Sequence, residues 1–161
     1  MTKLQPRCLR PLLIISVLAI ATTAVAGLPP AATLTGKVVK IADGDTLTLL
    51  VGKTQVKVRL EGIDTPERGQ PFGRKAGQAL AKSVFGNVVQ VDDFGKDRYG
   101  RTLGIVRLGR RNVNLELVQG GWAWWYRKYA PKNKELAAAE AAARRAKRGL
   151  WADAKPIPPW E

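Results

Sequence analysis

The chain has 161 residues, a length that suits one domain, and its formal net charge is +14 because 27 lysines and arginines accompany only 13 acidic residues. It contains no histidine, which excludes catalytic schemes built on imidazole, and its single cysteine excludes an internal disulfide framework. The charge favours polyanionic partners, namely nucleic acid, an anionic envelope or an acidic polysaccharide. A basic surface kept for solubility accounts for the charge equally well.

The first predicted element is an export signal. Lys3, Arg7 and Arg10 precede the apolar run Leu12–Val25, and Ala24-Val25-Ala26 supplies the small residues that a signal peptidase reads. An uncleaved membrane anchor is the alternative, but this run is shorter than the roughly 20 residues of a spanning helix. The pattern predicts a signal peptide over residues 1–26 and an exported protein, periplasmic or secreted, without a stable membrane anchor. The mature chain would have 135 residues, a charge of +11 and no cysteine.

Short β-type segments follow a flexible leader over residues 27–32. The run Thr33–Ile41 is rich in β-branched residues and ends at an Asp-Gly turn, and Thr46–Val51 follows it. Apolar and polar side chains alternate along Thr54–Glu61, which is typical of a half-buried strand. The short turns between these segments predict antiparallel pairing in a meander.

The spacing of the apolar residues then changes from that of a strand to that of a helix. Ala76, Leu80 and Val84 recur every four residues, which predicts about three helical turns ending near Gly86. The remaining predicted elements are strands over Val88–Phe94 and Arg101–Leu108, helices over Val113–Gln119 and Lys132–Arg148, and an irregular proline-rich tail over residues 153–161. Three strands, a helix and two strands follow the order of the OB-fold. The sequence therefore predicts an α+β, mainly β domain: a five-stranded barrel with about three helices.

Acidic residues cluster in residues 43–67, although acids on a binding surface would repel the phosphates of nucleic acid. Residues 43–67 hold five acids and three basic residues, and four of the acids lie in Asp43-Gly44-Asp45-Thr46 and Asp64-Thr65-Pro66-Glu67. These carboxylates repel phosphate unless a divalent cation lies between them, and calcium takes such hard oxygen ligands. Each segment alone is more typical of an ordinary turn or strand exit.

Two arginines accompany the acids. Arg59 lies five residues before Asp64 on the polar side of its strand, and Arg101 follows the loop Asp97-Arg98-Tyr99-Gly100. Attack on a phosphodiester concentrates charge on the non-bridging oxygens, which planar guanidinium groups meet with paired hydrogen bonds. An outward polar residue on an alternating strand is the alternative interpretation of Arg59.

Taken in order, these motifs resemble those of the thermonuclease (staphylococcal nuclease) family. The likeness continues through Gly121 to Pro131 and Arg148-Gly149-Leu150-Trp151, and it covers about residues 33–152. The resemblance implies a monomeric OB-fold enzyme that uses Ca²⁺ to hydrolyse DNA and RNA, leaving 3′-phosphates. It implies that Asp45 and Asp64 are carboxylate ligands of the ion, with the Thr65 carbonyl as a third ligand and Asp43 acting through water.

The same resemblance implies that Glu67 activates or orients the attacking water and that Arg59 and Arg101 clamp the phosphate. The implied nucleotide-binding residues are Arg98, Tyr99, Tyr126, Arg127 and Tyr129. The family prototype has two tyrosines two residues apart, whereas a gapless match gives Arg127 and Tyr129 here, so Tyr126 would supply the missing ring. The stretch Arg68–Lys75 is also shorter than the prototype's lysine-rich loop.

Two alternatives to an enzyme stay open. A non-catalytic OB-fold domain that binds nucleic acid is one, although the acids and arginines of the motifs are all present. A protein that binds an anionic polysaccharide of the envelope is the other, and charge alone supports it. Trp122 and Trp124 fit core packing better than base stacking, because large aromatic side chains mostly bury their area.

Overall fold

The computed structural model describes residues 32–160. The predicted signal peptide and nearly all of the predicted leader therefore lie outside the described residues. Within residues 32–160, no helix has both the length and the apolar character that crossing a membrane requires.

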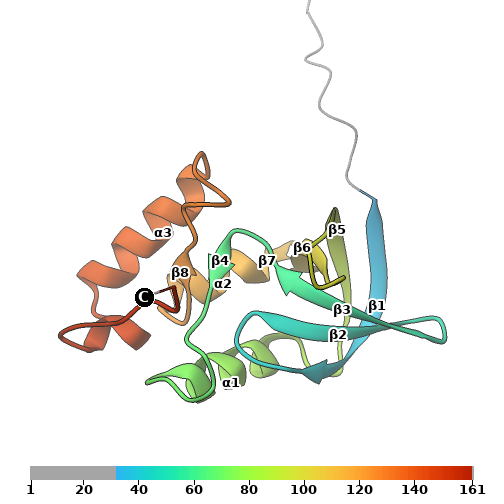
Figure 1. The fold of residues 1–161 in the computed structure, drawn as a ribbon, viewed down its shortest axis with the longest axis horizontal. Helices are drawn as coiled ribbons and strands as arrows, with labels where there is room; N and C mark the ends of the chain where they lie inside the picture. The colour runs from blue at the N-terminus through green and yellow to red at the C-terminus, as the bar shows by residue number, and fades with distance from the viewer. Residues whose placement is uncertain (1–31, 161) are drawn as a thin grey trace, which may run out of the picture.

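The strands form a closed barrel (Figure 1). Its members are β1 (Thr33–Ile41), β2 (Thr46–Val51), β3 (Thr54–Leu60), β5 (Val88–Lys96) and β6 (Thr102–Leu108). They follow the order β3-β2-β1-β5-β6 with antiparallel neighbours, and β3 closes the barrel by pairing in parallel with β6. The two-residue strand β7 (Arg111–Asn112) extends the sheet beyond β6. The predicted five-stranded, mainly β OB-fold is confirmed.

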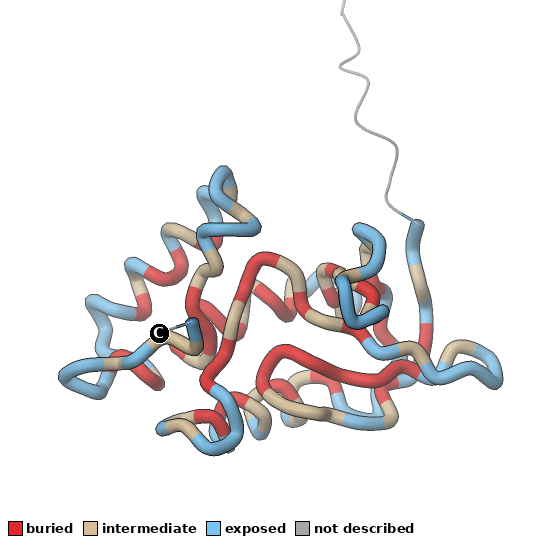
Figure 2. The backbone as a smooth tube through the Cα atoms, in the orientation of Figure 1, coloured by how far each residue is buried: buried red, intermediate tan, exposed pale blue. Residues whose placement is uncertain are grey.

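The barrel interior is aliphatic because alternate side chains of each strand point inward. Leu47 and Leu49 of β2, Val58 and Leu60 of β3 and Val106 of β6 are fully or almost fully buried. Burying one such side chain contributes about 1.5–3 kcal/mol relative to leaving it in water. In Figure 2 the buried stretches follow the strands and the inner sides of the helices, whereas the loop tips are exposed.

The domain has three helices, α1 (Gly73–Val84), α2 (Val113–Gln119) and α3 (Lys134–Arg145), and the short 3₁₀ segment η1 (Gly149–Ala152) follows them. Helices α1 and α2 pack against the barrel, whereas α3 packs against α2 on the side away from the barrel strands (Figure 1). The spacing predicted for α1 is confirmed, since Ala76, Leu80 and Val84 are its buried residues together with Gly73. The predicted bounds of α3 were too wide. Asn133 caps the helix by accepting a hydrogen bond from the Leu136 N–H, and Lys147 takes a positive φ of 50° after its last turn.

A small second sheet joins two segments far apart in the sequence. Strands β4 (Ile63–Asp64) and β8 (Trp124–Trp125) pair antiparallel, with Ile63 opposite Trp125 and Asp64 opposite Trp124. The acidic segment after β3 is thereby tied to the aromatic segment after α2. Trp124 is buried, so its predicted role in packing is confirmed.

Candidate active site

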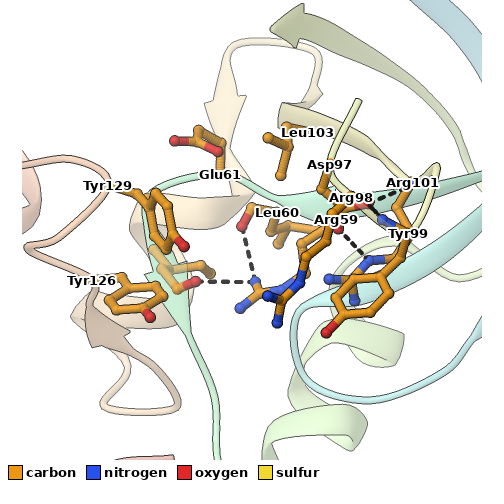
Figure 3. A pocket seen from close by; sticks show the side chains of 12 residues that line it. Arg59, Leu60, Glu61, Asp97, Arg98, Tyr99, Arg101, Leu103, Tyr126 and Tyr129 are labelled. Atoms are coloured by element: carbon orange, nitrogen blue, oxygen red, sulfur yellow. Dashed lines mark hydrogen bonds and ion pairs between the residues drawn. The ribbon is translucent and has the colours of Figure 1, made fainter. Parts of the chain in front are cut away.

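A cleft of about 420 Å³ opens beside the end of β3 (Figure 3). Three segments line it: the end of β3 with the turn after it, the loop between β5 and β6, and the residues that follow β8. The predicted site residues in its lining are Arg59, Arg98, Tyr99, Arg101, Tyr126 and Tyr129. Barrel closure and the β4–β8 pairing therefore bring together residues from positions 59 to 129.

Arg59 is fixed between two carboxylates. Its Nη1 atom lies 3.2 Å from Asp45 Oδ2, and its Nη2 atom lies 2.5 Å from Asp64 Oδ1. Nη1 also donates hydrogen bonds to the carbonyl oxygens of Leu60 and Ile63, each at 3.0 Å. Only 13% of the side chain is exposed, so Arg59 is not the outward, solvated residue of the alternative interpretation.

Asp45 is a buried carboxylate in a network of hydrogen bonds. Its Oδ2 atom accepts from the backbone N–H and the hydroxyl of Thr65, each at 2.9 Å, and its Oδ1 atom accepts from the Thr46 hydroxyl at 3.1 Å. Burial raises the pKa of Asp45 to about 7, although the Arg59 guanidinium opposes this shift. The same two influences act on Asp64, where burial prevails and raises the pKa. A desolvated pair of carboxylates of this kind favours a further cation.

The carboxylates fit a hard cation, but only as part of its shell. Within residues 32–160, no three acidic, histidine or cysteine side chains gather closely enough to enclose an ion. Asp45 and Asp64 share one guanidinium, and the Asp45 carboxyl is close enough to affect the pKa of Asp64. Hard oxygen donors in this small number suit Ca²⁺ with several water ligands.

The other predicted metal-site residues lie next to this pair. Thr65 is buried against Asp45 through its N–H and hydroxyl groups. Asp43 accepts a hydrogen bond from the Asp45 N–H at 3.1 Å, which closes the turn between β1 and β2, and it lines a neighbouring hollow with Arg68 and Arg74. Asp43 is therefore adjacent to the carboxylate pair without contacting Arg59.

Glu67 stands exposed on a tightly held turn. Its N–H donates to Gln70 Oε1 at 2.8 Å, and its carbonyl oxygen accepts from the Gln70 N–H at 2.9 Å. Gly73 packs so closely that an added Cβ atom would lie 1.9 Å from the Glu67 carbonyl oxygen. Glu67 is near enough to Asp64 to raise the pKa of that carboxyl. Its position is thus set by backbone contacts, and its side chain faces solvent.

Arg101 is oriented by Asp97 at the mouth of the cleft. Asp97 Oδ2 accepts from Arg101 Nε at 2.7 Å, while Oδ1 accepts from the N–H groups of Tyr99 and Arg101. Desolvation acts against ionisation of Asp97, but these hydrogen bonds outweigh it and lower the pKa. The terminal guanidinium nitrogens of Arg101 have no hydrogen-bond partner among residues 32–160. The Tyr99 ring lies under the guanidinium groups of both Arg98 and Arg101.

The predicted nucleotide contacts separate into two groups. Tyr126 and Tyr129 pack edge to face with ring centroids 4.8 Å apart, and in Figure 3 they lie across Arg59 from Tyr99 and Arg101. Arg127 is not part of the cleft. Its guanidinium lies over the Trp125 ring and 3.5 Å from Glu140, in a second groove.

Sequence reasoning missed several residues that shape the site. Glu61 and Leu103 line the cleft, and Gln70 holds the Glu67 turn. Asn114 is buried in α2, donates to the carbonyl oxygens of Glu61 and Gly104, and accepts from the Val106 N–H. A polar residue among the apolar positions of a short helix is the one signal that points to Asn114.

Comparisons with known proteins agree on one family. The family model described as staphylococcal nuclease homologue matches residues 57–153. The chain is 41% identical over 153 residues to micrococcal nuclease of Shigella flexneri, with 89% of this chain and 88% of the relative covered. It is 45% identical over 143 residues to protein ParB of Escherichia coli, covering 83% and 81%. It is 47% identical over 126 residues to an uncharacterized endonuclease of Haemophilus influenzae, covering 78% and 70%.

Proposed function

The chain belongs to the family of staphylococcal nuclease homologues, and on this premise we propose that it is an exported, Ca²⁺-dependent endonuclease of DNA and RNA that leaves 3′-phosphates. Family membership supports the endonuclease activity and a nucleic-acid substrate. The observation that carries the proposal is the convergence of Arg59 and Arg101 on one cleft, with Asp45 and Asp64 directly bound to Arg59.

Asp45, Asp64 and the Thr65 carbonyl would hold the ion, with Asp43 acting through water. Bound Ca²⁺ would polarise the scissile phosphate and offset its negative charge. The Thr65 and Thr46 hydroxyls donate to Asp45, so this carboxylate is oriented before any ligand binds. Few protein ligands and several waters give weak binding, with a Kd on the order of 10⁻⁴ M or poorer.

The two arginines would stabilise the charge that develops on the phosphate. Asp97 binds Arg101 through Nε, which leaves the two terminal nitrogens to donate to phosphate oxygens. Arg59 lies at the carboxylate pair and is held from four directions, so little reorganisation accompanies the reaction. Removal of one such donor costs about 10²–10³ in kcat.

Glu67 would take the proton from the attacking water. Its carboxylate is exposed, and its backbone is held by Gln70 and Gly73. A general base of this kind contributes about 10²–10⁴ in rate. The exposed rings of Tyr99 and Tyr129 are available for contacts with the nucleotide on either side of the cleft.

Cleavage of plasmid DNA by the purified mature protein tests the proposal, with Ca²⁺ in one arm and excess chelator in the other. We expect cleavage only with Ca²⁺, and full activity in chelator would overturn the metal assignment. Glu67→Ala should lower turnover about 10²–10⁴-fold. Arg59→Ala and Arg101→Ala should each lower it about 10²-fold or more. Arg110→Ala, an exposed arginine outside the cleft, is the charge-matched control.

A non-catalytic binder of nucleic acid is the alternative, and the same experiment separates the two. A binder would show no turnover, and its affinity would depend on lysines and arginines but not on Glu67. The export proposal has its own test, because the mass of the mature protein should place its first residue at Gly27. A mature protein that retains Met1 would refute export by signal cleavage.

A further inference from the structure

A second groove, of about 800 Å³, adjoins the proposed active-site cleft, and Tyr126 lines both. The groove lies between the residues after β8, helix α3 and the C-terminal tail. We propose that it binds the single-stranded part of the substrate that continues beyond the cleft, with Trp160 as a base-stacking platform. This inference rests on the proposed function, which it extends from a cleavage site to an elongated strand-binding site.

A continuous row of aromatic rings leads from the cleft into the groove. Tyr129 and Tyr126 pack edge to face in the cleft, and the Trp160 ring is parallel to Tyr126 within 1°, with centroids 5.0 Å apart. Trp160 also packs edge to face with the buried Trp124, which fixes the tail residue in place. Nevertheless 47% of Trp160 is exposed. An unpaired base stacked on this surface would continue the row, and base–aromatic stacking is indifferent to base identity.

The charge of the groove suits a phosphate backbone. Arg127, Lys128 and Arg144 line it, and its one acid is Glu140. The Glu140 carboxylate is buried and lies 3.5 Å from both Arg127 and Arg144, so two cations share a single negative charge. Arg127 and Arg144 stay largely exposed, and Lys128 contacts the Tyr129 ring at 5.7 Å. Two positive charges therefore remain for phosphate groups.

The combination of stacking surface and cations favours a single strand over a duplex. A duplex hides the faces of its bases in the helical stack and leaves Trp160 without a partner. The predicted nucleotide contact Arg127, which lies outside the cleft, acquires a role in this groove. If Trp160 stacks on a base, removal of its ring should weaken the binding of a single strand. If the tail instead shields Tyr126 from the substrate, removal of the ring should strengthen that binding, so the two roles can be told apart.

Binding in excess chelator tests the groove independently of cleavage. The probes are a fluorescently labelled single-stranded DNA 12-mer and a labelled trinucleotide, measured by fluorescence anisotropy with the mature protein. Trp160→Ala should weaken 12-mer binding about fivefold or more. The affinity for the trinucleotide, whose contacts we expect chiefly in the cleft, should change less than about twofold. Trp160→Phe keeps an aromatic ring and should retain most of the affinity, whereas Lys128→Ala should reduce the salt dependence of 12-mer binding.

The matched control is Ile157→Ala, because Ile157 is an exposed apolar residue of the same tail that does not line this groove. Equal loss in Trp160→Ala and Ile157→Ala would overturn the proposal, as would unchanged or tighter 12-mer binding by Trp160→Ala. Tighter binding would identify the tail as a shield. In Ca²⁺, Trp160→Ala should lower kcat/KM for the 12-mer but not for the trinucleotide. A protein that binds the 12-mer through Trp160 and never cleaves it would refute the proposed function and leave the groove intact.

Discussion

The close contact between Gly73 and the Glu67 turn allows the proposed general base to be moved without being removed. In Gly73→Ala the new Cβ atom would lie 1.9 Å from the Glu67 carbonyl oxygen, whereas such contacts are essentially never shorter than 3.0 Å. The two segments must therefore separate by about 1 Å or more. A displacement of this size in a catalytic group costs about 10²-fold in rate. We expect kcat to fall by that factor.

The stability of this variant should change much less than its activity. Crowding costs about 1–3 kcal/mol, and the better helix propensity of alanine at the start of α1 offsets up to about 1 kcal/mol of it. Steady-state cleavage of a fluorogenic oligonucleotide gives kcat and KM, and a thermal melt followed by circular dichroism reports the fold. KM should change less than about threefold, because the displaced group acts in the chemical step and not in binding.

Gly69→Ala is the matched control, since it makes the same substitution in the same loop where nothing lies within 4 Å of the added Cβ. It should keep the wild-type kcat. If Gly73→Ala melts at the wild-type temperature and also keeps the wild-type kcat, the position of Glu67 does not limit the reaction and the proposed role of Glu67 is refuted.

Three further measurements address the supporting residues. Asp97→Asn keeps one oxygen to accept from the Tyr99 and Arg101 N–H groups but removes the carboxylate charge that binds Arg101 Nε, so kcat should fall about 10- to 100-fold. A KM effect with unchanged kcat would contradict a positioning role. Asn114→Ala leaves the buried Val106 N–H unpaired and should lower the free energy of unfolding in urea by about 1–3 kcal/mol; an unchanged value would show that this N–H finds another partner. In excess chelator the melting temperature should fall as pH rises from about 4 to 7, because burial raises the pKa of Asp45 from 3.8 to about 7 and the folded state alone keeps the proton in this range. Asp45→Asn should flatten that slope, and an equally steep slope in this variant would place its origin elsewhere.

The elements that were predictable from the sequence are those with a local period. Alternation along residues 54–61 and four-residue spacing from Ala76 to Val84 identify a strand and a helix, and both are confirmed. The bounds of α3 were predicted too wide because helix propensity continues through the alanine- and arginine-rich sequence. Single residues set the two ends of the helix. Asn133 caps its start, and Lys147 in the left-handed region follows its end, and neither effect depends on helix propensity.

Contacts between distant segments were not predictable in this way. The β4–β8 pairing has two residues in each strand, too few to show any period. The contact of Asn114 with Glu61 spans 53 residues, and the stacking of Trp160 on Tyr126 depends on the path of a tail without helix or strand. The metal-site, catalytic and nucleotide-binding residues came from the motif resemblance. Their roles stay predictions, although the structure places most of them around the carboxylate pair and the cleft.

With Arg59 and Arg101 in their proposed roles, the parallel pairing of β3 with β6 would make catalytic competence an all-or-none property of the folding chain. This ladder joins Val58 to Thr102, 44 residues later, and Arg59 lies within it while Arg101 directly precedes it. Closing so long a loop is entropically costly until the strands between are in place. A nascent or truncated chain that ends before residue 101 contains Asp45, Asp64 and the Glu67 turn but lacks the guanidinium of Arg101. During refolding, the circular dichroism signal of the helices should therefore recover first. The ability to cut phosphodiester bonds should return only when β3 pairs with β6 and closes the barrel.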